Sequence, residues 1–153
     1  MSTLRPHSEY GEALKALKGQ CAFCLPQEPF VIKDYLHWSW IFNKYPYWKY
    51  NTMLILKRHI TSFSELSNQE LQELRYAEGD IEARYIRSGI VGPESSFGTE
   101  LLMFWRRRVD SPIKKSVEHL HLHIAPEFEG AWSSILHQDA WDIDMNLLKE
   151  DAV

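Results

Sequence analysis

The stretch that decides the fold is Val117-Glu118-His119-Leu120-His121-Leu122-His123-Ile124. Polar and apolar residues alternate along it, which is typical of a β-strand with one buried face. Because successive side chains of a strand point to opposite faces, the three histidines share one face and the leucines share the other. We therefore expect a strand over Ser116–Ala125 whose leucine face packs into a core.

The segments around this strand predict an α+β domain with an antiparallel sheet of about five strands. The tetrapeptide Ser67-Asn68-Gln69-Glu70 is a capping box and opens the longest helical pattern, which we expect to end before Gly89. A short N-terminal helix is expected over Ser8–Lys18, with Ser8 as its N-cap and Gly19 as its stop. The other expected elements are strands over Phe30–Asp34, Trp38–Asn43, Asn51–Lys57 and Thr99–Arg106, and a helix over Trp141–Lys149.

The length of 153 residues predicts one domain over residues 1–153. Hydrophobic residues make up 44% and charged residues 25%, which excludes disordered, collagen-like and coiled-coil chains. No apolar run approaches the ~20 residues that cross a bilayer, and the N-terminus lacks the apolar core of a secretory signal. We therefore expect a cytoplasmic protein without a membrane partner. A formal charge of −4 argues against nucleic acid as a partner, because non-specific binding depends on excess positive charge.

Three imidazoles on one strand face need an explanation, since burying them without partners is costly. A solvated polar face is one explanation, because antiparallel sheets can face water on one side. Chemistry is the favoured explanation and takes two forms. Two histidines of the row can bind one metal ion together with remote ligands, or one imidazole can act as a nucleophile whose neighbours set its tautomer. The metal-binding and nucleophile interpretations are compatible if different histidines of the row have different roles.

Cys21 and Cys24 supply candidates for the remote ligands, in a single C-x-x-C. A reducing compartment keeps such a pair as thiols, so a metal or redox role is favoured over a disulfide.

The run His119-Leu120-His121-Leu122-His123-Ile124-Ala125 resembles the signature of the histidine-triad family, in which histidines and apolar residues alternate. Ser116-Val117 stands where the family has a Ser-Val or Thr-Val pair, and Lys57-Arg58-His59-Ile60 is similar to the family's Pro-Lys-Arg-His segment. The resemblance covers a core over residues 21–126. It implies the histidine-triad-like α+β fold, with the N-terminal helix at 8–18 before that core and an extension at 127–153 after it.

The resemblance implies a nucleotide hydrolase or transferase that cleaves a bond at the α-phosphorus of a nucleotide. The resemblance makes His121 the nucleophile that forms a nucleotidyl-histidine intermediate, with His123 and His119 as the flanking members of the catalytic row. Ser116 would donate a hydrogen bond to the phosphate or leaving group, and Asn43 stands at the ribose-recognition position. For Ser116 and Asn43, a polar group bonded to local backbone is an equally weighted alternative. The implied substrates are adenine or guanine (di)nucleoside polyphosphates, phosphoramidates or nucleotidyl esters.

The same resemblance implies a structural zinc ion. A subset of the family, and the related galactose phosphate uridylyltransferases, hold zinc with two cysteines, the histidine of the Lys-Arg-His segment and the first histidine of the triad. The matching residues are Cys21, Cys24, His59 and His119, a closed Cys₂His₂ set. Buried thiols or a redox pair are the alternative. The resemblance also implies a homodimer.

The chain departs from the family pattern before the triad. The usual glycine-containing segment is replaced by residues 108–115, and Asn51 stands where many relatives have histidine. Two explanations fit the cations of this region: they bind phosphate in place of backbone amides, or they form a solvated hairpin end. The candidate nucleotide-binding cations are Arg108 and Lys115. The missing glycines favour a nucleotide-binding protein without activity as one alternative; a transferase and a catalytic metal centre are the others.

Overall fold

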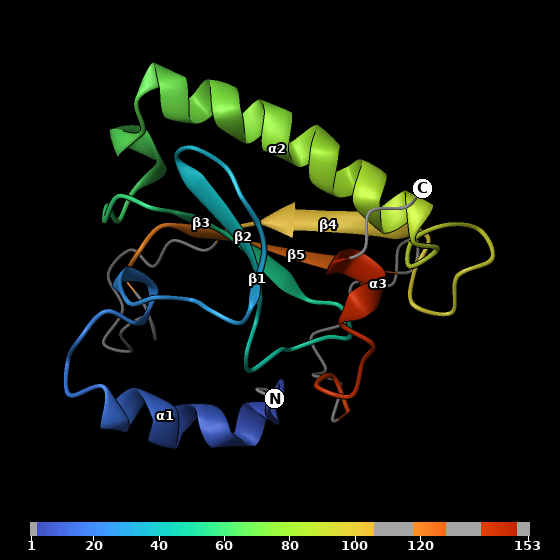
Figure 1. Cartoon of the computed structure of the whole chain (residues 1–153), viewed down its shortest axis with the longest axis horizontal. Coiled ribbons are helices and arrows are strands. Elements are labelled where there is room, and N and C mark those ends of the chain that lie inside the picture. The colour runs from blue at the N-terminus through green and yellow to red at the C-terminus, as the bar shows by residue number, and fades with distance from the viewer. Residues whose placement is uncertain (1–2, 106–117, 128–138, 150–153) are drawn as a thin grey trace.

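The computed structural model describes residues 3–105, 118–127 and 139–149. Its centre is a five-stranded antiparallel sheet with the order β1-β2-β3-β5-β4 (Figure 1). The helices and sheet together confirm the expected α+β class and strand number. The strands are β1 (Val31–Asp34), β2 (Trp38–Phe42), β3 (Thr52–Leu56), β4 (Glu100–Phe104) and β5 (His121–Glu127), and the helices are α1 (Tyr10–Ala16), α2 (Asn68–Arg87) and α3 (Asn146–Lys149), with 3-10 turns η1 (His7–Glu9), η2 (Ala22–Cys24) and η3 (Phe63–Glu65).

Helix α2 covers one face of the sheet, and most of the core lies between them (Figure 1). The alternating strand residues that face α2 include Trp38, Leu54 and Leu122, and each is buried. The indole nitrogen of Trp38 donates to the backbone carbonyl of Glu70 on α2 at 2.9 Å, so the buried indole keeps a hydrogen-bond partner. This packing sends the intervening residues of the same strands to the opposite face.

The opposite face, which we call the α1 face, carries a smaller apolar cluster of Ile41, Met53 and Ile55. Helix α1 lies on this side of the sheet (Figure 1). Strand pairing places Ile55 opposite His121 and Met53 opposite His123. The sheet therefore presents both strand histidines on the α1 face, while their leucine neighbours fill the core, as the alternation predicted.

Both ends of α2 match the sequence prediction. Ser67 is the N-cap and forms a full capping box with Glu70. Gly89 follows the helix with a φ of 79°, a left-handed conformation that favours glycine. A long helix with defined ends fixes where the loop before it, which carries His59, meets the sheet.

Several expected boundaries differ from the structure. Strand β5 begins at His121, because the preceding Leu120 donates its backbone N–H to Ile60 at 2.7 Å instead of continuing the ladder. Ser8 does not cap the N-terminal helix: it lies inside η1, and the N-cap of α1 is Glu9, without a side-chain capping bond. Helix α3 is also shorter than the expected 141–149. Across the described ranges, no helix has the length and apolar character that a membrane span requires.

Candidate functional site

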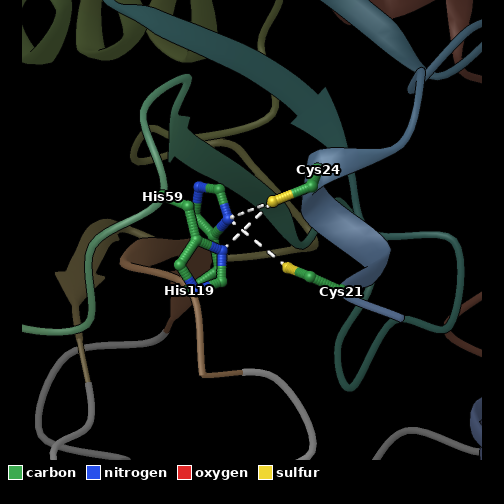
Figure 2. A group of neighbouring side chains, drawn as sticks. All are labelled: Cys21, Cys24, His59 and His119. Carbon is green, nitrogen blue, oxygen red and sulfur yellow. Dashed lines mark hydrogen bonds between the residues drawn. The ribbon is translucent and has the colours of Figure 1, made fainter. Parts of the chain in front are cut away.

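Four side chains from three separate segments meet beside the start of β5. Cys24 is the last residue of the turn η2 and Cys21 is its N-cap, while His59 comes from the loop after β3 and His119 from the residues just before β5 (Figure 2). Their sulfur and nitrogen ligand atoms all lie within 4.8 Å of one another. The Nδ1 atom of His119 lies 3.4 Å from the sulfur of Cys21 and 3.5 Å from that of Cys24, and the Nδ1 atom of His59 lies 3.1 Å from Cys24.

These separations suit one zinc ion. A tetrahedral zinc with Zn–S of ~2.3 Å and Zn–N of ~2.0–2.1 Å separates its sulfur and nitrogen ligands by about 3.6 Å. The donor set, two thiols and two imidazoles, is one that structural zinc sites use. The four residues that the resemblance implied as ligands are thus brought together with chemistry and spacing that fit the ion.

Local structure aims the ligand atoms at a common point. The backbone N–H of Cys24 donates to the carbonyl of Cys21 at 3.2 Å, which closes η2 and keeps both sulfurs on one side of the turn. His119 donates from Nε2 to the carbonyl of Leu56 at 2.6 Å, so its Nδ1 lone pair points toward the sulfurs. Burial also lowers the pKa of His119, which favours the neutral imidazole that binds a metal.

His59 is held in place by its neighbours along the chain. Arg58 donates to both carboxylate oxygens of Glu70, at 2.8 and 3.2 Å, and so ties the loop to the first turn of α2. On the other side, the carbonyl of Ile60 accepts from the backbone of Leu120. These two connections keep the imidazole of His59 beside that of His119, with ring centroids 4.7 Å apart.

His121 lies two residues after His119 and is oriented by a hydrogen bond to the backbone of that residue. Its Nδ1 lies 2.7 Å from the carbonyl oxygen of His119. A carbonyl only accepts, so Nδ1 carries the proton and the lone pair is on Nε2. His121 is half-buried and lines a cavity on the α1 face. His121 therefore has both a defined tautomer and access to the cavity.

His123 is buried beside it, with only 5% of its surface exposed. Its ring lies 5.1 Å from that of His121, stacks on Phe104 at 5.4 Å, and meets the edge of Tyr47 at 5.7 Å. Phe104 is also its direct partner across the β4–β5 pairing. Aromatic neighbours therefore hold His123 in one place at the wall of the cavity.

The cavity itself has a volume of about 820 Å³, within the range of small-molecule sites. Its walls come from α1, from the segment that includes η2, and from the α1 face of the sheet. Apolar and aromatic side chains such as Leu14, Phe23 and Met53 dominate it, and His121 and His123 contribute polar atoms. An apolar hollow with a few defined polar groups is typical of a ligand site.

Asn43 lies at the wall of the cavity, and both atoms of its amide have protein partners. It donates to Asn51 at 3.0 Å and accepts from the backbone of Tyr45 at 3.0 Å. Asn51 in turn accepts from the backbone of Tyr47 and donates to the carbonyls of Thr52 and Ile124. The two amides together hold the loop between β2 and β3. Asn51 donates two hydrogen bonds and accepts two, which a neutral imidazole at this position could not do, because it has one donor and one acceptor nitrogen.

Three candidates from the sequence lie outside the described residues: Ser116, Arg108 and Lys115. Conversely, sequence reasoning missed two aromatic residues beside the histidines, Phe23 and Phe104. Phe23 contacts the ring of His121 at 4.9 Å, and Phe104 stacks on that of His123 at 5.4 Å. The position of Phe23 between Cys21 and Cys24 could have predicted a place beside the histidines, because a residue between two candidate ligands lies close to the other ligands of the same site.

No family model matches the sequence, and a search of the curated proteins returns no match. Solved structures do match. A hypothetical histidine triad nucleotide-binding protein from Sulfolobus tokodaii has 20% identity and a TM-score of 0.51, over 84% of this chain and 85% of that one. A zinc-bound histidine triad family protein from Mycobacterium smegmatis has 18% identity and a TM-score of 0.54, over 85% and 91%.

A uridylyltransferase mutant has 17% identity and a TM-score of 0.57 over 78% of this chain, which spans 40% of that longer protein. At such identities the likeness is one of fold, and it agrees with the five-stranded sheet and the resemblance at residues 119–125. The chain therefore has the fold of the histidine-triad proteins.

Proposed function

We propose that this protein is a nucleotide hydrolase of the histidine-triad family that cleaves at the α-phosphate through His121. One observation carries the proposal: the 2.7 Å contact from Nδ1 of His121 to the His119 carbonyl, on a ring that lines the cavity. Neutral imidazole with its lone pair on Nε2 is a good nucleophile near neutral pH, because its ordinary pKa is ~6.5. The substrates are (di)nucleoside polyphosphates, nucleoside phosphoramidates or nucleotidyl esters, with adenine or guanine as the base.

The reaction proceeds in two displacements. In the first, the Nε2 lone pair of His121 forms a bond to the α-phosphorus, and the leaving group departs with the electron pair of its former bond and takes up a proton. In the second, a water oxygen attacks the same phosphorus, the N–P bond breaks, and its electrons return to Nε2. The proton of the water is released, and the products are a nucleoside monophosphate and the free enzyme. Two steps, each with a lower barrier, replace one difficult displacement.

The neighbouring residues position this chemistry. The His119 carbonyl holds the tautomer of His121, and His123 orients the ring or polarises the phosphate. Asn43 is proposed at the ribose, while Ser116, Arg108 and Lys115 are proposed at the phosphate from the sequence resemblance. Most of the catalytic effect in phosphoryl transfer comes from such positioning and from charge stabilisation.

We propose that Cys21, Cys24, His59 and His119 hold one structural zinc ion. When bound, the ion would fasten the N-terminal turn to the segment before β5. Four protein ligands leave no open position, so the ion's contribution is to folding. The fold shared with a zinc-bound histidine triad protein supports this role.

A transferase is the second candidate, supported by the fold that the chain shares with a uridylyltransferase. In that case a phosphate or hydroxyl group of an acceptor replaces water in the second displacement. The retained third histidine favours hydrolysis, since the related uridylyltransferases resemble His-x-His-x-Gln in the triad. Loss of activity with nucleotide binding retained is the third candidate. A cytoplasmic location and a homodimeric state stay predictions from the sequence.

The test is turnover of diadenosine polyphosphates and adenosine phosphoramidates by the wild-type protein and by His121→Ala. We expect the variant to lose turnover, while the control His37→Ala, a half-buried histidine away from the cavity lining, keeps it. Equal turnover by wild type and His121→Ala would rule out the proposed nucleophile. Product analysis with sugar phosphates present separates hydrolysis from transfer, and calorimetry with nucleoside monophosphates detects binding without turnover.

A further inference from the structure

We propose that Phe23 is a positioning residue that holds the imidazole of His121 at its reactive orientation. The inference rests on the proposed role of His121 and extends it to a residue of the cysteine turn. Through this ring, the segment that carries the two cysteines reaches the nucleophile directly.

The contact geometry is that of a specific aromatic pair. The ring of Phe23 lies 4.9 Å from that of His121, with an angle of 71° between their planes. It also meets the ring of His119 at 6.0 Å and 82°. Edge-to-face pairs at these separations are favoured over parallel ones because they match the charge distribution of the rings. One phenylalanine thus contacts both a proposed zinc ligand and the proposed nucleophile.

The other constraints on His121 leave a role for this contact. The hydrogen bond from Nδ1 to the His119 carbonyl fixes one edge of the ring, and the ring of His123 lies 5.1 Å away at 71°. The hydrogen bond at Nδ1 does not by itself stop the ring from rocking about that atom. Phe23 adds a further contact to the ring and limits this motion, so that Nε2 keeps its direction.

Phe23 is itself anchored from two sides. In the chain it lies within η2 between Cys21 and Cys24, and in space it packs against the apolar cluster of the α1 face. That cluster includes Ile41 and Met53, both nearly fully buried. A ring held by the turn and by the sheet is a rigid surface for His121, which is what a positioning contact requires.

Because Phe23 also lines the cavity, direct contact with substrate is the competing role. The two roles differ in kinetics. A positioning residue acts on the chemical step and lowers kcat, whereas a residue that binds substrate equally in the ground and transition states raises KM. Steady-state kinetics therefore distinguish them.

The experiment compares the full-length wild type with Phe23→Leu, Phe23→Tyr and Phe97→Leu, for kcat, KM and zinc content. Phe97 is a matched control: it is half-buried and meets Tyr50 at 4.9 Å and 72°, a nearly identical ring geometry at a residue without a proposed catalytic role. We expect Phe23→Leu to lower kcat by about 10- to 100-fold with little change in KM or zinc content. Phe23→Tyr, which keeps the ring, restores most of kcat, and Phe97→Leu leaves it near the wild-type value.

Three results would overturn the proposal: an unchanged kcat in Phe23→Leu, a rise in KM alone, or a loss of kcat in parallel with zinc. A second readout does not depend on activity. In protein with ¹⁵N-labelled histidine, we expect one Nδ1–H tautomer for His121 in the wild type and altered ring resonances with mixed tautomers in Phe23→Leu. If the wild type turns over no substrate, the proposed function fails, and the spectra alone decide the contact: identical His121 signals in both proteins reject it.

Discussion

Replacing Glu70 with glutamine removes the charge that joins α2 to the loop carrying His59. The carboxylate accepts from the Arg58 guanidinium at 2.8 and 3.2 Å and from the backbone N–H of Ser67 at 2.8 Å. The side chain of Glu70 is 5% exposed. A glutamine at this position would keep the size of the side chain but would lose the charge-assisted bonds, so the variant tests the pair rather than the packing.

The magnitude follows from the pKa of Glu70. The hydrogen bond from Arg58, foremost, and those from Ser67 hold this pKa at about 2, below the ordinary value of 4.5, although burial acts in the opposite direction. That lowering corresponds to about 3 kcal/mol, at 1.36 kcal/mol for each pKa unit. The Arg58 side chain is 52% exposed, so water screens the pair and we expect about 2 kcal/mol. For a chain of this length, that lowers Tm by about 4–8 °C.

The assay is thermal and urea unfolding of wild type and Glu70→Gln as a function of pH. A carboxylate whose pKa is lowered on folding stabilises the folded state above its unfolded pKa, and this contribution disappears as the pH falls through the folded pKa. The difference between the two proteins should therefore be full above pH ~4.5 and shrink toward pH ~2. A double-mutant cycle with Arg58→Gln isolates the pair. A difference that is absent at neutral pH, or that grows on acidification, would refute the reasoning.

Three further predictions concern other parts of the molecule. Cys21→Ser should lose bound zinc and unfold at a lower temperature than wild type, as metal analysis and calorimetry will measure; protein purified without chelator and found free of zinc would contradict the zinc site. Asn51→Leu should lower the free energy of unfolding by about 2–4 kcal/mol in urea titration, because it leaves its buried partners unsatisfied; a loss below about 1 kcal/mol would count against the amide network. Asp80→Asn should cost only about 1 kcal/mol by the same method, since its partner Lys33 is partly exposed; a loss above about 3 kcal/mol would show that the pair matters more than its exposure indicates.

If the proposals hold, the two functions of the histidine row are divided by a change of backbone conformation. His119 precedes β5 and turns Nδ1 toward the cysteines, whereas His121 is the first residue of the strand and donates a hydrogen bond from Nδ1 to the backbone carbonyl of His119. Two successive histidines of one motif, His119 and His121, would then supply a metal ligand and a nucleophile. The carbonyl of the ligand residue sets the tautomer of the nucleophile.

The sequence by itself determined the elements of secondary structure and the faces of the strands. Alternation over residues 117–124 assigned the leucines to the core and His121 and His123 to the other side, because side-chain direction in a strand is a local property. The capping box at Ser67 and the glycine at position 89 bounded α2 for the same reason. The four candidate zinc ligands were also identified, although only from resemblance to a family, since nothing local relates Cys21 to His119.

Only the tertiary structure decided how distant residues meet. The order β1-β2-β3-β5-β4 brings the segment before β5 beside the end of β3, and this pairing places His59, His119 and the cysteine turn around one point. It also decided that β5 starts at His121, that this ring is protonated on Nδ1, and that Phe23 lies against it. Each depends on contacts between residues far apart in the chain, and hydrophobic periodicity carries no information about which distant partner a residue will have.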